Sequence, residues 1–214
     1  MSLFLGKIHY WLFNKIKWFE GLEENIVDWA KEKGDFPVDE WKEEIYNKYG
    51  APIENKPLEE IIDTSNIHGW LQDKIARGEG RQSAWVTKIL NSSPESIKDL
   101  INIFEKQGSK LGSEYAEKST VSTPIEVYNM LNDYILEGMP CDRVNETLEN
   151  SEDTYSWITT SCLHEPYWQK EMGDVNNFYI LREAWIKSFI KALNTPFNYY
   201  AYIKNGMRVH EIKR

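Results

Sequence analysis

The first 140 residues follow the hydrophobic pattern of amphipathic helices. Apolar residues recur every three or four positions, and glycine or proline separates one such segment from the next. Gly21 is expected to end the first helix, and the capping-box pair Thr123 and Glu126 is expected to begin the last. The predicted helices cover residues 3–20, 22–33, 37–49, 58–91, 93 to about 108 or beyond, and 123 to a point before Gly138.

After residue 140 the pattern changes from helical to extended. Two hairpins are predicted, each with two runs of β-forming residues around a turn signal: Asn150–Asp153 in the first and Asn205-Gly206 in the second. The runs cover residues 142–149, 154–162, 197–204 and 207–214, and helices are expected between the hairpins over 165–172 and 176–194.

These elements predict an α+β protein. A helical N-terminal half, residues 1–140, is expected to pack with a four-stranded antiparallel sheet in residues 141–214, in the chain order β-β-α-α-β-β. No linker or low-complexity segment separates the two regions. We therefore expect one compact unit or two closely packed lobes.

The first hairpin holds both cysteines of the chain. If residues 150–153 form its loop, Glu149 faces Thr154, and counting outward in antiparallel register places Cys141 opposite Cys162. Two thiols would then share one end of the sheet. The N-terminal segment has neither the pattern of a signal peptide nor that of a membrane span, so we expect a reducing cytoplasm, where paired thiols bind metal, react or pack.

A zinc site is one interpretation of this hairpin end. Zinc commonly takes four thiolate or imidazole ligands, and Cys141, Cys162, His164 and His210 supply the right types and number. His210 is expected opposite Ala201 in the second hairpin, and its distance from the other three depends on strand order, which the sequence does not fix. The alternative is that these are ordinary packed thiols and histidines.

A catalytic cysteine is another interpretation. Nucleophilic thiolates form beside a cation or a helix N-terminus. His164 follows Cys162 closely, and the helix expected to begin at Glu165-Pro166 would direct its positive end toward them. Cys162 and His164 are therefore candidate catalytic residues.

An internal repeat lies within the helical half. Residues 8–21 match residues 67–80 at 8 of 14 positions without a gap, which indicates a duplicated helix. If the two copies pack antiparallel, His9 meets Glu79 and His68 meets Glu20. These pairs would be either hydrogen bonds between helices or metal ligands. A duplicated helix also suits an interaction module that pairs with a partner or with a second copy of the chain.

Composition narrows the class of ligand. The net charge of -9 disfavours nucleic acid, and a mean hydropathy of -0.59 indicates a soluble protein. Nine Trp, twelve Tyr and eight Phe are many for 214 residues, so large rings must fill a core or line a pocket.

Residues 141–214 also carry a family resemblance. The segments Trp157–Cys162, Met172-Gly173-Asp174 and Gly206–Ile212 resemble the C-terminal half of L-2-amino-thiazoline-4-carboxylic acid hydrolase-like proteins and of 4-vinyl-reductase-type small-molecule-binding domains. The resemblance implies a small ligand held between sheet and helices, and the hydrolase relatives open a thiazoline ring. His210 stands where that family has cysteine, and Ala184-Trp185 replaces its expected Cys and Asp.

The leading hypothesis is therefore a cytoplasmic protein that binds a small molecule in a Trp- and Tyr-lined pocket. Hydrolysis of a small sulfur- or nitrogen-containing ring, or of an amide, would be centred on Cys162 and His164. The alternatives are a zinc site with a structural or sensory role, and a non-enzymatic helical interaction module that leaves homo-oligomerisation open.

Overall fold

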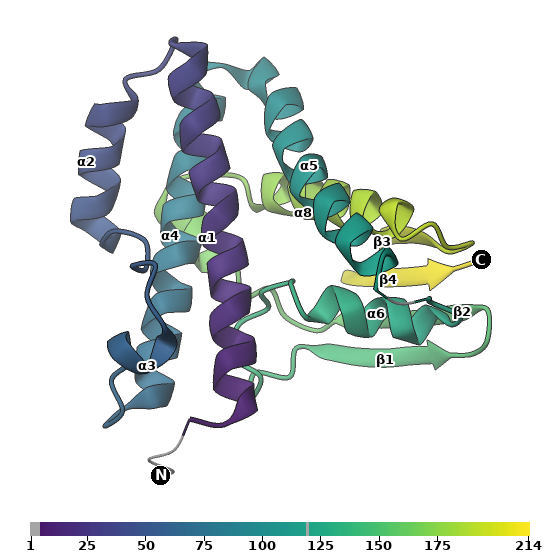
Figure 1. The fold of residues 1–214 in the computed structure, drawn as a ribbon. Coiled ribbons are helices and arrows are strands. Elements are labelled where there is room, and N and C mark those ends of the chain that lie inside the picture. The colour runs from purple at the N-terminus through teal and green to yellow at the C-terminus, as the bar shows by residue number, and fades with distance from the viewer. Residues whose placement is uncertain (1–4, 119) are drawn as a thin grey trace. The chain divides into compact units, whose positions relative to one another are not determined.

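The computed structural model describes residues 5–118 and 120–214 and confirms the α+β class (Figure 1). Helices fill the N-terminal half, a four-stranded antiparallel sheet lies in the C-terminal region, and two helices separate the strand pairs. The elements are α1 (Lys7–Lys33), α2 (Val38–Tyr49), α3 (Leu58–Ile61), α4 (Ile67–Ser92), the 3-10 turn η1 (Pro94–Ser96), α5 (Ile97–Ala116), α6 (Pro124–Asn132), β1 (Asn145–Asn150), β2 (Thr154–Thr159), α7 (Glu165–Lys170), α8 (Val175–Ala192), β3 (Asn198–Lys204) and β4 (Met207–Lys213). Of the helices described, none is both long and apolar enough to cross a bilayer.

The chain forms two compact units that interleave along the sequence. The first unit takes the chain up to Ser96 together with Tyr134–Met139 and His164–Asp174. The second takes Ile97–Asp133, Pro140–Leu163 and Val175–Arg214. A division at residue 140 would group α5 and α6 with the other helices, but α5 packs on α8, and α6 packs on β2 and β4.

In the first unit, α1 runs without a break through Gly21, so the expected helix end there is wrong. A glycine inside a helix costs about 1 kcal/mol relative to alanine. Phe19, Leu22 and Ile26 are buried on either side of it. Each such side chain contributes about 1.5–3 kcal/mol on burial, so packing outweighs the glycine cost.

The helix expected over 58–91 is divided instead into α3 and α4. Asp63 accepts a hydrogen bond from the Ser65 backbone N–H at 2.9 Å, and the Asn66 side chain accepts one from the Gly69 N–H at 3.1 Å. Short polar side chains compete for backbone hydrogen bonds in this way and favour turns and helix starts. The duplicated segment 67–80 therefore begins its own helix.

The duplicated helices α1 and α4 run in the same direction (Figure 1). The rings of His9 and His68 pack edge to face with centroids 6.3 Å apart, and Arg81 of α4 donates to Glu20 of α1. The equivalent residues Leu12 and Leu71 are buried, as are Ile16 and Ile75. The parallel arrangement excludes the His9–Glu79 and His68–Glu20 pairs that antiparallel packing would give.

In the second unit the strand order is β1-β2-β4-β3. The closing hairpin has the expected register, with Lys204 opposite Met207 and His210 opposite Ala201. Its loop, Asn205-Gly206, has positive φ angles of 52° and 79°, as a two-residue hairpin turn requires.

The first hairpin has a different register from the one expected. Asn150 lies opposite Tyr155 and Glu149 opposite Ser156, so residues 151–154 connect the paired residues and the register differs from the expected Glu149–Thr154 pair from the loop onward. A bulge between Thr147 and Glu149 then changes the register by one residue. A count from the expected loop therefore goes wrong at the first pair, and the bulge prevents any one regular register from describing the whole hairpin. Cys141 precedes β1 and Cys162 follows β2, so the predicted cysteine pair across the strands is wrong.

The helical layer of the second unit depends on two glycines of α5. A Cβ on Gly108 would collide with the carbonyl oxygen of Trp185, and one on Gly112 with that of Phe189, both on α8. Glycine therefore allows the two backbones to approach closely, and α5 continues past Gly108 to Ala116.

Candidate functional site

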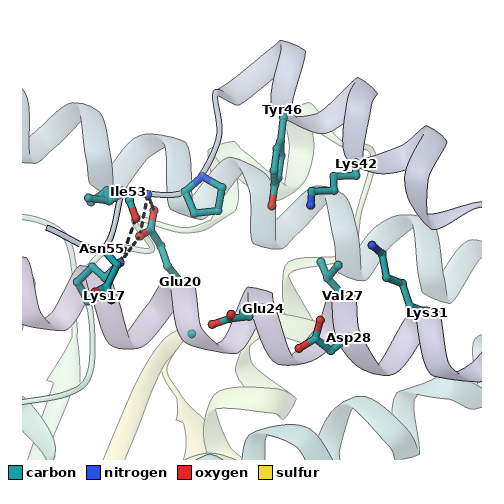
Figure 2. Close-up of a pocket in the computed structure, with 12 residues that line it drawn as sticks. Lys17, Glu20, Glu24, Val27, Asp28, Lys31, Lys42, Tyr46, Ile53 and Asn55 are labelled. Atoms are coloured by element: carbon teal, nitrogen blue, oxygen red, sulfur yellow. Dashed lines mark hydrogen bonds and ion pairs between the residues drawn. The ribbon is translucent and has the colours of Figure 1, made fainter.

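A cavity of about 510 Å³ lies in the first unit between α1, α2 and the segment that follows α2. Glu20, Glu24 and Asp28 line it from α1 and lie on one face of that helix, because four residues make slightly more than one turn (Figure 2). Lys42 and Tyr46 face them from α2, again four residues apart. The rest of the lining is Lys17, Gly21, Val27, Lys31, Pro52, Ile53 and Asn55.

Glu20 is the buried anchor of the cavity, with 5% of its surface exposed. It accepts hydrogen bonds from the Arg81 guanidinium at 2.5 Å and from the backbone N–H of Ile53 at 3.1 Å. Lys17 lies 4.0 Å from it and donates to the Ile53 carbonyl at 3.1 Å. These contacts hold the carboxylate of α1 in one position at the cavity wall.

Arg81 of α4 connects this wall to a second buried carboxylate. Its Nε donates to Glu23 at 2.7 Å, while Glu23 and Arg81 are each only 1% exposed. Burial raises the pKa of the Glu23 carboxyl, and the neighbouring Arg81 charge opposes that rise. One Glu23 oxygen has no hydrogen-bond partner among the described residues, so Arg81 satisfies only half of this carboxyl.

The hydroxyl of Tyr46 points into the cavity (Figure 2). Burial raises the pKa of Tyr46 to about 12, and the charge of Glu23 adds to the effect. Tyr46 therefore keeps its proton at physiological pH and can both donate and accept a hydrogen bond. Of the residues that line the cavity, Tyr46 alone carries an aromatic ring.

Charges of both signs lie opposite one another across the cavity without forming ion pairs. Within the described part of the chain, Glu24 and Asp28 have no cationic partner, and Lys42 has no anionic one. Lys31 pairs at 3.3 Å with Asp39, whose side chain is 91% exposed. Glu24, Asp28 and Lys31 are solvent-exposed, and Lys42 lies over the Tyr46 ring, 5.4 Å from its centroid, so these charged groups are accessible to a ligand.

A second buried cluster surrounds His164. Its Nδ1 lies 2.9 Å from Glu79 and its Nε2 lies 3.0 Å from Glu137, and the histidine is fully buried. An ionised carboxylate only accepts hydrogen bonds, and a neutral imidazole donates only one. The geometry therefore requires two protons among the three side chains: an imidazolium, or a neutral imidazole beside a protonated carboxyl.

The sequence-predicted site residues lie in separate surroundings. Cys141 is exposed and Cys162 is half-buried, and neither forms a disulfide within the described residues. In the second unit His210 stacks on Trp157 with ring centroids 4.9 Å apart, and its ring nitrogens contact the hydroxyls of Tyr199 at 2.6 Å and Thr159 at 3.2 Å.

These contacts bear on the zinc and hydrolase hypotheses. Both histidines have a protein partner at each ring nitrogen, so zinc binding by His164 or His210 would have to displace one. Over residues 5–118 and 120–214, no group of three or more His, Cys, Asp or Glu side chains is placed to hold a metal ion. His164 would likewise have to release a carboxylate before acting as a base for Cys162.

Sequence reasoning missed the cavity residues of α1 and α2. The spacing of Glu20, Glu24 and Asp28 places them on one helix face, but an acidic stripe on a helix is usually a solvated surface. Only the position of Lys42 and Tyr46 across from it makes the stripe part of a cavity. The aromatic excess lies elsewhere, for example where Tyr128 contacts Tyr155 and Trp157 in the second unit.

Comparisons of this chain with known protein families, with curated proteins and with solved structures find no match. The resemblance of residues 141–214 to thiazoline-carboxylate hydrolase-like and 4-vinyl-reductase-type domains therefore stays a prediction. A function for this chain has to be argued from its own geometry.

Proposed function

We propose that this protein binds a small polar molecule in the cavity between α1 and α2. The observation that carries the proposal is Glu20, a buried carboxylate that Arg81 and the Ile53 N–H hold at the wall of an open cavity. Small-molecule pockets measure about 300–1,000 Å³ and place a few fixed polar groups around the ligand. The cavity volume of about 510 Å³ lies in that range, and the lining is more polar than is usual for such pockets, which suits a polar ligand.

The energetics of the Arg81 network support the proposal. Burying ionised groups costs several kcal/mol each, and apolar residues of similar size often stabilise a fold better. A buried Arg81 with two carboxylates beside a cavity is therefore hard to explain by stability alone. Tyr46, whose pKa is raised by burial, lines the cavity, and perturbed titratable groups that line a cleft are typical of functional sites.

Hydrolysis at Cys162 and His164 stays a separate prediction. His164 is held by Glu79 and Glu137 and does not line the α1–α2 cavity. Binding in that cavity needs neither Cys162 nor His164, so the two ideas can be tested independently.

The test is equilibrium dialysis of the full chain against a defined mixture of free amino acids, dipeptides, carboxylic acids, nucleosides, sugars and diamines. Mass spectrometry of the retained fraction identifies what binds. We expect the unmodified protein to retain at least one compound. Asn55→Trp, which places a large ring at an exposed cavity-lining position, is expected to abolish that retention.

Glu54→Trp is the matched control, because residue 54 is exposed, adjacent in sequence and outside the cavity lining. It should retain the same compound as the unmodified protein. Retention of nothing by the unmodified protein would overturn the proposal. Equal retention by Asn55→Trp would also overturn it, because binding would then lie elsewhere.

A further inference from the structure

We infer that the ligand of the α1–α2 cavity is a zwitterion that carries a primary ammonium group and a carboxylate, such as a free amino acid or a dipeptide. This assignment rests on the binding function proposed above and specifies its ligand class. The ligand class is inferred from which charged side chains of the cavity already have an ion-pair partner and which, called open below, have none or only a weak one.

The open anionic groups are Glu24 and Asp28. They lie one helical turn apart on the cavity face of α1, about 6 Å along the axis, and neither has a cationic partner among the described residues. Glu20, one turn earlier, is occupied by Arg81 and the Ile53 N–H. A ligand ammonium group would therefore bind at Glu24 and Asp28.

The open cationic groups lie at one end of the same cavity. The ammonium groups of Lys42 and Lys31 extend into this end from α2 and α1, respectively (Figure 2). Lys42 has no ion pair within the described residues, and Lys31 has only the exposed Asp39. Exposed ion pairs contribute about 0–1 kcal/mol, so a ligand carboxylate can replace Asp39 at little cost.

Tyr46 lies across from Glu24 and Asp28, and its hydroxyl points from α2 toward α1 (Figure 2). A hydroxyl can accept from an ammonium group and donate to a carboxylate. It can therefore contact either end of a zwitterion, whichever way a particular ligand is oriented.

Charge matching excludes two other ligand classes. A diamine would suit the carboxylates of α1 but would bring its charge beside Lys31 and Lys42. A phosphate or dicarboxylate would suit the lysines but would meet Glu24 and Asp28. Like charges placed together weaken binding, so a cavity with two unpaired carboxylates, unpaired Lys42 and weakly paired Lys31 favours a ligand that carries both signs of charge.

The experiment is isothermal titration of the full chain with matched probes. Each of the twenty free amino acids and the dipeptide glycylglycine is compared with its N-acetyl form, which lacks the ammonium group, and its amide, which lacks the carboxylate. Putrescine and inorganic phosphate complete the set. We expect at least one zwitterion to bind, and its N-acetyl and amide forms to bind about tenfold more weakly or worse.

Charge-removing variants locate the two ends of the ligand. Glu24→Gln is expected to weaken zwitterion binding about tenfold while leaving the weak binding of the N-acetyl form unchanged. Lys42→Gln should weaken zwitterion binding similarly and leave the amide unchanged. Glu32→Gln and Lys7→Gln are the controls, because both residues are exposed positions of α1 outside the cavity lining and should bind as the unmodified protein does.

Each other outcome overturns a defined part of the argument. If putrescine or phosphate binds, no zwitterion binds, and Asn55→Trp abolishes that binding, then the cavity does bind a ligand but the zwitterion assignment is wrong. Zwitterion binding that neither Glu24→Gln nor Lys42→Gln changes also overturns the assignment. Failure of every probe, together with an empty dialysis result, overturns the ligand class and the proposed function together.

Discussion

Arg81 lies completely buried between Glu20 and Glu23, so its charge is matched by groups on another helix and not by water. It also donates to the Gly50 carbonyl at 3.3 Å, which ties the end of α2 to α4. Arg81, Glu20 and Glu23 therefore form one connected set of buried polar side chains. At the scale of single residues, this set determines both local stability and the position of the cavity wall.

Arg81→Met is expected to lower the free energy of unfolding by about 3–5 kcal/mol, because it leaves two buried carboxylates without their cation. Urea denaturation followed by tryptophan fluorescence measures the loss. Arg77→Met, one turn earlier on α4, is the matched control: Arg77 is 44% exposed and pairs with Asp73, so its loss should stay below about 1 kcal/mol. A loss of less than about 1 kcal/mol in Arg81→Met would contradict the network.

The raised pKa of the Glu23 carboxyl predicts how the free energy of unfolding depends on pH. Burial raises its pKa above the ordinary value of 4.5, so the folded state binds the proton more tightly than the unfolded chain does. The stability that comes from protonated Glu23 is full below pH 4.5 and is lost as the pH rises through the folded-state pKa.

Glu23→Gln remains neutral and cannot lose that contribution. Relative to the unmodified protein, its free energy of unfolding should therefore increase steadily as the pH rises above about 4.5. Urea denaturation at a series of pH values from 4 to 8 measures the trend. Exposed Glu32→Gln should show no such trend, and a flat difference for Glu23→Gln would count against a raised pKa.

At the scale of elements, backbone contacts decide where glycines are needed. The contact of α5 with α8 places Gly108 against the Trp185 carbonyl, and the Trp185 indole N–H donates to Gln107 at 2.9 Å. By helix propensity alone, Gly108 would be expected to destabilise α5. The packing instead makes it the point of closest approach between the two helices.

Gly108→Ala tests which effect dominates. Helix propensity predicts that alanine stabilises α5 by about 1 kcal/mol. The collision of its Cβ with α8 predicts destabilisation, typically about 1–3 kcal/mol for overpacking. We expect net destabilisation in thermal and urea unfolding, whereas exposed Lys110→Ala should change stability by less than about 0.5 kcal/mol. A more stable Gly108→Ala protein would show that the helices separate easily.

At the scale of the whole molecule, the first unit is assembled from segments that are far apart in sequence. The His164 ring connects Glu79 of α4 to Glu137. Ser83, also on α4, donates to the Tyr167 carbonyl at 3.3 Å. Trp168 of α7 is also buried, with 1% exposure. The N-terminal helices therefore depend on residues that come after most of the second unit.

A fragment of residues 1–96 is accordingly expected to fail to fold cooperatively. It would leave Glu79 buried without His164 and would expose the surface of α4 that α7 covers. Calorimetry and circular dichroism of the fragment, beside the full chain, make the comparison. A sharp unfolding transition in the fragment would show that Tyr134–Met139 and His164–Asp174 are dispensable.

The sequence by itself determined the class of the fold and most of its elements. Apolar periodicity and caps such as Thr123 and Glu126 report local preferences of the backbone, which are present before any tertiary contact. The Asn205-Gly206 turn likewise sets its own register, because few residues tolerate its two positive φ angles. Local signals were sufficient wherever the chain interacts mainly with its own neighbours.

Only the tertiary structure decided the rest. The position of the loop in the first hairpin, together with the bulge in β1, gives a register that does not pair Cys141 with Cys162, and packing continues α1 through Gly21 against a local stop signal. The candidate binding site could not be predicted from the sequence for the same reason, because it depends on tertiary contacts. Glu24 and Lys42 have opposing charges in one cavity because α1 and α2 pack side by side, and no pattern within either helix specifies that contact.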